Sequence, residues 1–235
     1  MDEAVASVRS LVQSGGSHHV ITLNVTMLGR AARDESFRRI VNSAALVTAD
    51  GMGTLLVGRI LGVRFPERVA GVDLTDRLCA MCATEGFRVF FFGAAPGVAE
   101  AAAERLRQRH HGLRVAGSRH GYVPAEEVPQ VVAQIRSSAP DLLLVALGSP
   151  KQEEWLARHL AASGARVGIG VGGSFDVYGG RLNLAPQWIR AIGLEWLYRI
   201  LREPRRWRAA AAIPGVIALA VKERLSRRWK STKTG

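Results

Sequence analysis

The chain has 235 residues, a length that fits one large α/β domain or one domain with an appendage. Of these residues 48% are hydrophobic and 22% charged, an ordinary composition for a globular protein. Its N-terminus starts with acids and lacks an apolar core segment, and no stretch reaches the ~18 apolar residues of a spanning helix. A signal peptide and a membrane span are therefore not expected, and we predict a protein that is kept in the cytoplasm.

Apolar runs alternate with helical patterns along most of the chain. In chain order, the runs predict buried strands at 19–24, 45–50, 87–93, 113–117, 141–148 and 165–173. Helices are predicted at 34–44, 52–61, from 74 onward, 96–110, 124–138 and 149–163, the last with Ser149 as its N-cap. Continuous apolar runs are typical of parallel strands that are covered on both faces. The predicted fold is a Rossmann-like α/β domain, a mostly parallel sheet with helices on both faces.

The C-terminal part is helical and basic, so we divide the chain into an α/β catalytic domain, 1–185, and a C-terminal appendage, 186–235. Residues 199–235 hold eleven Lys and Arg against two Glu, which gives +9 of the total net charge of +12. Such a tail favours an anionic partner, either nucleic acid or a membrane surface.

The appendage also contains thirteen residues without a charge, 209–221, between basic clusters that include Trp. This segment is too short to span a bilayer and is similar to an interfacial membrane segment. The alternative is a helix that packs on the body and leaves a solvated basic end. The one-signed charge favours the membrane, because anionic lipids contribute roughly 1 kcal/mol per nearby Lys or Arg.

Motifs for metals and dinucleotides are weak. Cys79 and Cys82 form a lone C-x-x-C inside a helical pattern, which predicts two packed thiols, and the chain has no D-x-D. Residues 168–173 match G-x-G-x-x-G, but these glycines begin inside a strand, so dinucleotide binding stays a minor alternative. We therefore predict no metal site and no cofactor.

Polar residues at the carboxyl ends of the predicted strands are the candidates for function, since ligands of open α/β sheets bind there. Thr22, Asn24 and Asp50 end the first two strands. Lys151 and Gln152 add a cation and an amide to a strand–helix turn of a kind that suits phosphate. For Asp50, residue type and position alone favour an N-cap of the following helix.

Several stretches, taken together, resemble the WecG/TagA/CpsF family of bacterial glycosyltransferases over about residues 19–208. They occur in the family's order and are "ITLNVTML", "ADGMGT", "PERVAGVDL", "FFFGAAPG", "LGSPKQE", "GVGGSFDVYGGRLNLAPQWIR" and "GLEWLYRILREPRR". Members transfer a sugar, often N-acetylmannosamine or its uronic acid, from a UDP donor. Their acceptor is a sugar on a polyprenyl diphosphate at the inner membrane face.

The resemblance implies a role for the acidic turn after the second strand. Asp50 would be the base that takes the acceptor's proton in an inverting transfer, with Thr22 and Asn24 orienting the sugar. Gly51 and Gly53 would let the substrate approach the backbone.

The missing D-x-D motif predicts a donor site without a metal, and the resemblance implies which residues bind the nucleotide. Arg68 would neutralise the charge on the leaving UDP; otherwise it is a solvated loop arginine. The nucleotide site would contain Tyr122, Lys151, Gln152, Gly172 and Asp176. The alternatives are a packed tyrosine for Tyr122, a helix-start glutamine for Gln152 and a turn aspartate for Asp176.

In the appendage, Arg199 and Arg206 match the family's positions near the lipid diphosphate. Relatives often carry a further basic residue where this chain has Ala209, with Arg208 one position earlier. We assign all three arginines to the membrane side of the site.

The sequence thus predicts an inverting glycosyltransferase at the cytoplasmic face of the plasma membrane. It would move a hexosamine, N-acetylmannosamine above all, from UDP to a polyprenyl-diphosphate-linked sugar such as GlcNAc, in cell-wall or surface-polysaccharide synthesis. A UDP-glucose or UDP-uronic-acid transferase of the same family is the first alternative. A basic nucleic-acid-binding protein and a dinucleotide-dependent oxidoreductase are alternatives from other classes, and we expect no nucleic-acid partner. The oligomeric state stays open, a homo-oligomer included.

Overall fold

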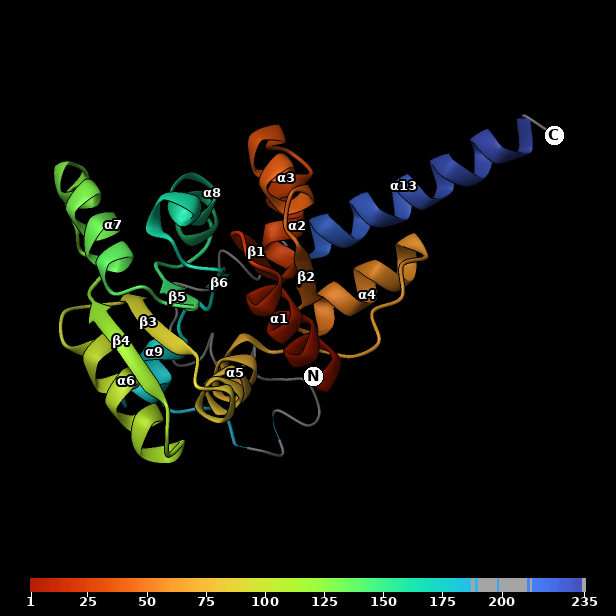
Figure 1. Cartoon of the computed structure of the whole chain (residues 1–235). Coiled ribbons are helices and arrows are strands. Elements are labelled where there is room, and N and C mark those ends of the chain that lie inside the picture. Colours follow the sequence, from red (N-terminus) through yellow and green to blue (C-terminus); the bar gives the residue numbers. More distant parts are fainter. Residues whose placement is uncertain (187–188, 190–197, 199–210, 212, 234–235) are drawn as a thin grey trace. The chain divides into compact units, whose positions relative to one another are not determined.

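The structure, a computed structural model, describes residues 1–186, 189, 198, 211 and 213–233. Its centre is one six-stranded sheet in the order β2-β1-β6-β5-β3-β4 (Figure 1). Four neighbouring pairs, β1 with β6, β6 with β5, β5 with β3 and β3 with β4, run parallel. The strands are β1 His18–Leu23, β2 Leu46–Ala49, β3 Arg88–Gly93, β4 Arg114–Arg119, β5 Leu142–Ala146 and β6 Val167–Gly170. The predicted α/β fold with a parallel sheet is confirmed.

Helices join the strands and cover the sheet. They are α1 Asp2–Ser14, α2 Val25–Ala31, α3 Glu35–Asn42, α4 Met52–Leu61, α5 Gly71–Glu85, α6 Val98–Arg109, the 3₁₀ turn η1 Ala125–Glu127, α7 Val128–Ser137, α8 Lys151–Ser163, α9 Ser174–Tyr178 and α13 Ile213–Lys233. The prediction for α4 is confirmed to the residue. The prediction that Ser149 caps α8 is wrong, because the helix begins at Lys151 and Pro150 occupies the N-cap position.

The apolar strands contribute side chains to two hydrophobic cores, one on each face of the sheet. This explains why apolar and polar residues do not alternate along these strands. In β3, Val89 and Phe91 pack into a core with α1, α5, α6 and α9. Phe90 and Phe92 point the other way, into a core with α7 and α8. Since successive side chains of a strand face opposite sides, a strand buried on both faces must be apolar throughout.

Two helices near the N-terminus were not predicted. α1 buries Ala4, Val5, Val8 and Val12, a spacing of three to four residues that is typical of an amphipathic helix. α2 has only seven residues and begins directly after β1, so it is too short to show a periodic pattern.

The chain divides into two compact units that are not contiguous in sequence. The first unit contains Met1–Thr22, Arg39–Thr48 and Val69–Leu184. The second contains Leu23–Arg38, Ala49–Arg68 and Ala185–Gly235. The C-terminal segment therefore clusters with two earlier pieces of the chain. The predicted division into a catalytic domain and a membrane-associating appendage concerns roles, and it stays a prediction.

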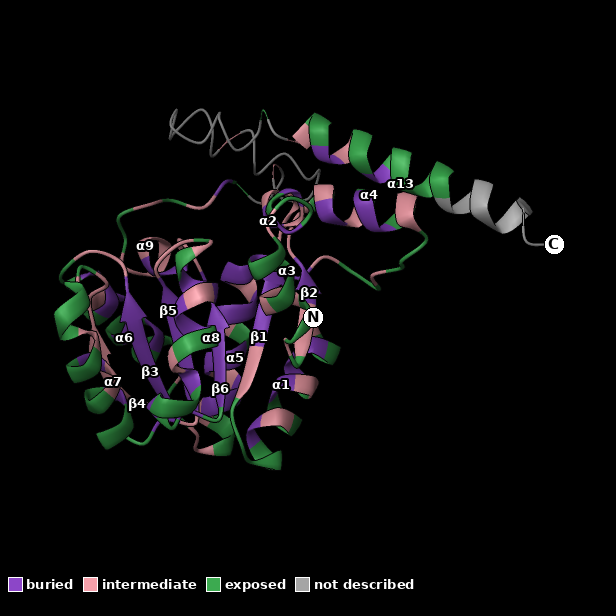
Figure 2. Cartoon of the chain, turned by 90° about the horizontal axis from the view of Figure 1, so that it is seen from above, coloured by how far each residue is buried: buried purple, intermediate pink, exposed green. Residues whose placement is uncertain are grey.

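Within the second unit, α13 packs on α2 and α4. Val216 and Ala220 are buried there with Val57 of α4, and Figure 2 shows the exposed residues of α13 on its other sides. Gly29 of α2 makes the contact possible, because a Cβ at this position would lie 2.6 Å from Cγ2 of Val216. The described part of the uncharged segment, 209–221, thus buries one face on protein, while Leu219 and Val221 remain about two-fifths exposed. No helix among the described residues is long and apolar enough to cross a membrane.

Candidate functional site

In the second unit, Asp50 is held at the junction between a strand end and a helix start. Its backbone N–H donates to the carbonyl of Leu23 at 2.8 Å. The hydroxyl of Thr54 donates to the same carbonyl at 3.1 Å and to the carbonyl of Asp50 at 3.0 Å. Because Asn24 directly follows Leu23, the structure brings the predicted residues Asp50 and Asn24 to the same strand ends.

The alternative in which Asp50 is the N-cap of α4 is wrong. The N-cap residue is Gly51, with φ 88° and ψ 154°, a conformation that favours glycine. Asp50 lies one position earlier and is half-buried. Asp50 therefore lies at the mouth of the turn, before the helix terminus.

The two glycines after Asp50 have different roles. A Cβ on Gly51 would meet no heavy atom within 4 Å, so the backbone there is open to a ligand. A Cβ on Gly53 would lie 3.2 Å from Cβ of Val25, so this glycine lets α4 approach α2. The prediction that Gly53 makes room for substrate is corrected to a packing role.

Thr22 and Asn24 lie at the predicted strand end, but both side chains form hydrogen bonds with backbone groups of the protein. The buried hydroxyl of Thr22 donates to the carbonyl of Gly170 at 3.0 Å, within the first unit. Oδ1 of Asn24 caps α2 by accepting from the N–H groups of Thr26 and Met27. The amide NH₂ of Asn24 is the group that could still contact a sugar.

In the first unit, β3 and β5 form a topological switch point. The chain continues from β3 outward to β4 and from β5 in the opposite direction to β6, and open α/β sheets bind ligands in the crevice at such a point. The turns that follow β3 and β5 pack closely on each other, because a Cβ on Gly93 would lie 2.5 Å from the carbonyl of Ala146. The backbone N–H of Ala94 also donates to that carbonyl at 2.8 Å.

Tyr122 lies beside these turns. The N–H of Gly121 donates to the carbonyl of Ala94 at 2.8 Å, and a Cβ on Gly121 would meet Leu147 and, at 3.0 Å, Cα of Gly93. Tyr122 itself is 73% exposed, so the alternative of a packed tyrosine is wrong. A free aromatic face at a switch point can stack on a nucleotide base.

Gln152 is buried and engaged by protein groups. Its Oε1 accepts from the N–H of Gly172 at 3.0 Å, and its Nε2 donates to Oε1 of Glu153 at 2.7 Å. A Cβ on Gly170 would clash with the Gln152 amide, so a glycine is needed where β6 ends. The predicted pair Gln152 and Gly172 is thus brought together, with Gln152 positioning the turn that carries Gly172.

Glu153 is a residue that the sequence analysis missed. It is 1% exposed, and its Oε2 has no hydrogen-bond partner among the described residues. Burial raises the pKa of its carboxyl, and hydrogen bonds from Gln152 and Ser149 only partly oppose this. A signal was present, because Glu153 shares the buried face of α8 with Leu156 and Leu160 at helical spacing.

The remaining predicted residues are distributed over both units and the undescribed region. In the first unit, Asp176 is half-buried in the first turn of α9, and Lys151 is exposed at the start of α8. In the second unit, Arg68 is half-buried in the loop after α4. The appendage residues Arg199, Arg206 and Arg208 lie outside the described residues.

The thiols and the metal-ligating side chains of the described residues offer no further reactive group. Cys79 and Cys82 are free and buried, as predicted, and burial raises the pKa of Cys82 to about 12. In the described part of the chain, no three His, Cys, Asp or Glu side chains are grouped so that they could hold a metal ion.

A family comparison identifies the group of proteins that share this arrangement. The model of the "Glycosyl transferase WecG/TagA/CpsF family" matches residues 1–230. The chain belongs to this family. The resemblance carried by the seven sequence stretches is thereby confirmed, and the WecG/TagA/CpsF match extends beyond them at both ends.

Curated relatives share one name, "N-acetylglucosaminyldiphosphoundecaprenol N-acetyl-beta-D-mannosaminyltransferase". The relative from Bacillus spizizenii W23 is 34% identical over 86% of this chain and 78% of its own length. That from Bacillus subtilis 168 is 30% identical over 89% and 81%. That from Staphylococcus aureus MW2 is 32% identical over 86% and 79%. As a member of the WecG/TagA/CpsF family, this chain is a glycosyltransferase.

Proposed function

We propose that this glycosyltransferase moves N-acetylmannosamine from a UDP donor to GlcNAc on a polyprenyl diphosphate. The observation that carries the proposal is the shared name of the relatives, which are 30–34% identical to the chain over at least 78% of their own length. That name specifies the mannosaminyl group and the lipid-linked GlcNAc, and it does not favour a glucose or uronic-acid transferase. Neither the family nor the relatives favour a nucleic-acid-binding protein or an oxidoreductase.

The stereochemistry supports a single displacement with one base. A β-mannosaminyl product from an α-linked nucleotide sugar requires inversion at the anomeric carbon. In that step the acceptor hydroxyl attacks this carbon, the bond to the UDP oxygen breaks, and a base takes the hydroxyl proton. Asp50 is our proposal for this base, because its half-buried carboxylate lies beside the open backbone of Gly51.

The leaving UDP needs positive charge and hydrogen-bond donors. We propose that the switch-point turns of the first unit bind the nucleotide, with Tyr122 against the base and Asp176 on the uracil or ribose. Gln152 would act by positioning the turn of Gly172, whose N–H it accepts. Arg68 would balance the negative charge of the leaving group. The chain has no D-x-D motif to hold a metal, so we propose that a metal is dispensable.

The donor class is tested by thermal shift of the full chain with UDP and with NAD. We expect UDP to raise the melting temperature and NAD to leave it unchanged, since a ligand stabilises only the state that binds it. A shift with NAD and none with UDP would reject a UDP donor.

A further inference from the structure

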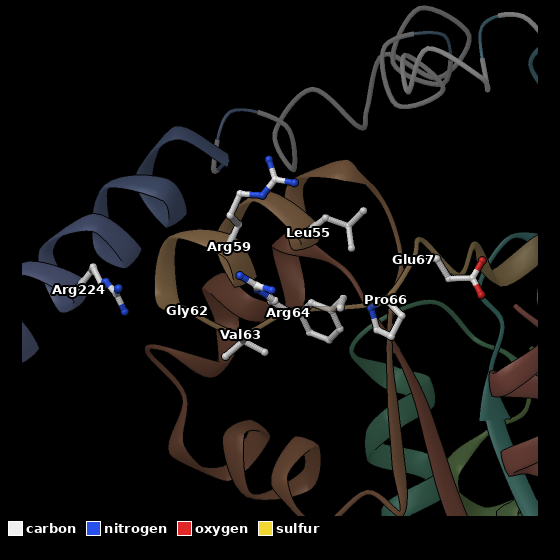
Figure 3. Close-up of a pocket in the computed structure, with 9 residues that line it drawn as sticks. Leu55, Arg59, Gly62, Val63, Arg64, Pro66, Glu67 and Arg224 are labelled. Carbon is white, nitrogen blue, oxygen red and sulfur yellow. The ribbon is translucent and has the colours of Figure 1, made fainter.

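A groove of about 740 Å³ lies wholly within the second unit, along α4 from Leu55 to its C-terminal end (Figure 3). Its walls come from α4, the loop after it and α13. The residues that define its chemistry are Arg59, Val63, Arg64, Phe65, Glu67 and Arg224. None of them was assigned a role by the sequence analysis.

The groove has three arginines and one glutamate in its lining, an excess of positive charge. The guanidinium groups of Arg59, Arg64 and Arg224 form no ion pair or hydrogen bond with any residue that the structure describes. Glu67 is the single carboxylate of the lining, and in Figure 3 it points away from the arginines. Three like charges around one hollow repel one another, and a bound anion would relieve this repulsion.

The helix terminus accounts for only part of this charge. α4 ends at Gly62, whose φ is 80° and ψ 11°, and the guanidinium of Arg224 lies over this residue. A cation near the last carbonyls of a helix is favourable, and one such residue is a common feature. Arg59 and Arg64 add two more positive charges to a terminus that carries about half a unit of negative charge.

The other wall of the groove is apolar and partly open to solvent. Val63 is 51% exposed, and the ring of Phe65 packs closely on Gly58 of α4. Leu55 of α4 and Pro66 of the following loop complete the apolar part of the lining. Exposed apolar side chains beside arginines favour a ligand that has both an anionic and a hydrocarbon part.

We propose that this groove binds the diphosphate and the first isoprene units of a polyprenyl diphosphate. Arg59, Arg64 and Arg224 would hold the phosphates, a role that the resemblance gives to Arg199 and Arg206. Val63 and Phe65 would lie against the hydrocarbon. Three guanidinium groups match the several charges of a diphosphate better than the single charge of a phospholipid phosphodiester. This inference rests on the proposed function, in which the acceptor is such a lipid.

The position along α4 suits that acceptor. The helix has ten residues, or about 15 Å; Asp50 precedes its first turn, and the groove extends along it from Leu55 to the end, where its arginines lie. The sugar of the acceptor separates its reacting hydroxyl from its diphosphate. One helix would therefore align the proposed base with the sugar, and the groove with the lipid phosphates.

Isothermal titration of the full chain with farnesyl diphosphate tests this proposal, with inorganic diphosphate and farnesol as reference ligands. We expect farnesyl diphosphate to bind at least about tenfold more tightly than either reference, because only it uses both walls. The double variant Arg59→Gln/Arg64→Gln should weaken its binding about tenfold or more. The matched double variant Arg136→Gln/Arg158→Gln removes two exposed arginines of the first unit and should bind as the wild type does.

A second variant tests the apolar wall. Val63→Ser should narrow the difference in affinity between farnesyl diphosphate and inorganic diphosphate, and it leaves the arginines in place. Equal binding by the Arg59→Gln/Arg64→Gln variant and the wild type would overturn the proposal. So would anionic phospholipid vesicles that displace farnesyl diphosphate at equal phosphate concentration, because the groove would then be a headgroup site.

The outcomes separate this proposal from the proposed function. The thermal shift with UDP is measured on the same preparations. If UDP raises the melting temperature and the arginine variant binds farnesyl diphosphate as the wild type does, the groove is not the lipid site, and the proposed UDP donor stands. If farnesyl diphosphate binding depends on the arginines but UDP does not change the melting temperature, the UDP donor is rejected and the groove stands as the lipid site.

Discussion

At the scale of single residues, the buried acid Glu153 organises the proposed donor site. Its carboxyl accepts from the amide of Gln152, which in turn accepts from the N–H of Gly172. Burial raises the pKa of this carboxyl, so the neutral acid is favoured over the carboxylate more than in water. A neutral side chain with an acceptor oxygen should therefore serve at this position.

Substitution of Glu153 tests this chain of contacts. Glu153→Gln keeps an acceptor for Gln152 and should retain kcat and the donor KM within a few fold. Glu153→Leu removes the acceptor and should raise the donor KM about tenfold, with a smaller change in kcat, because the turn of Gly172 loses its support. Steady-state transfer kinetics check both, with the exposed Glu100→Leu as control. Equal donor KM values in the Gln and Leu variants would contradict the positioning role.

The raised pKa of Glu153 also predicts that the stability of the protein depends on pH. Because its pKa is raised on folding, its contribution to stability is present at low pH and is lost as pH rises through the folded pKa. The wild type should therefore lose stability relative to Glu153→Gln as pH is raised from 5 to 8. Urea unfolding at both pH values measures the difference, and two parallel pH profiles would contradict the raised pKa.

At the scale of elements, the strand β1 carries a group with the opposite dependence. Burial lowers the pKa of His19 from 6.5 to about 4, and its Nε2 has no partner among the described residues. Between these pH values the unfolded chain binds a proton that the native strand does not. Stability should thus fall as pH drops from about 6.5 to about 4.

His19→Leu should remove that dependence. From pH 7.5 to 4.5 the wild type should lose roughly 2–3 kcal/mol of unfolding free energy more than the variant, at about 1.4 kcal/mol per pKa unit. Urea titrations at the two pH values give the difference. The same loss in both proteins would show that His19 titrates normally in the folded state.

The contact between α2 and α13 depends on one missing methyl group. Gly29→Ala would place Cβ 2.6 Å from Val216, so α13 must shift, at a cost of about 1–3 kcal/mol. Backbone amides of α13 should then exchange with deuterium faster. Gly215→Ala on α13 is the matched control, because a Cβ there meets nothing within 4 Å and exchange should not accelerate. Unchanged exchange in Gly29→Ala would contradict the packing.

The length and burial of an element decide whether it could be predicted from the sequence. The strand of three consecutive Phe and the ten-residue α4 were predicted because each combines an apolar run with a clear end, such as Gly62. The seven-residue α2 has no room for a period. At the candidate site, the strand-end positions of Asp50 and Gln152 were predicted, whereas the inward bonds of Thr22 and Gln152 were not. The bonds between Thr22 and Gly170 and between Gln152 and Gly172 join residues far apart in sequence, and spacing cannot reveal them.

At the scale of the whole molecule, the two units are built from interleaved segments, which no local pattern could indicate. The C-terminal segment that the sequence assigned to the membrane belongs to the unit that also contains Asp50 and the basic groove. Residues 209–235 contain six Lys and Arg against one Glu. We therefore propose that this unit faces the membrane that holds the lipid acceptor.

Flotation with anionic liposomes tests the membrane proposal. Deletion of residues 209–235 should abolish flotation, because it removes both the charge and the exposed apolar face of α13. Since the deletion also removes buried residues, the full-length variant Val221→Ser/Leu225→Ser serves as a second test and should float less without a change in melting temperature. Unchanged flotation of both proteins would contradict the proposal.

The most direct test of the account is transfer of N-acetylmannosamine from UDP to a GlcNAc-diphosphate-polyprenol by wild type and Asp50→Asn. The wild type should form the disaccharide lipid with inversion. Asp50→Asn should fold and turn over about 10²–10⁴-fold more slowly, as expected when a general base is lost. No product from the wild type would contradict the proposed donor and acceptor, and full activity in Asp50→Asn would contradict the proposed base.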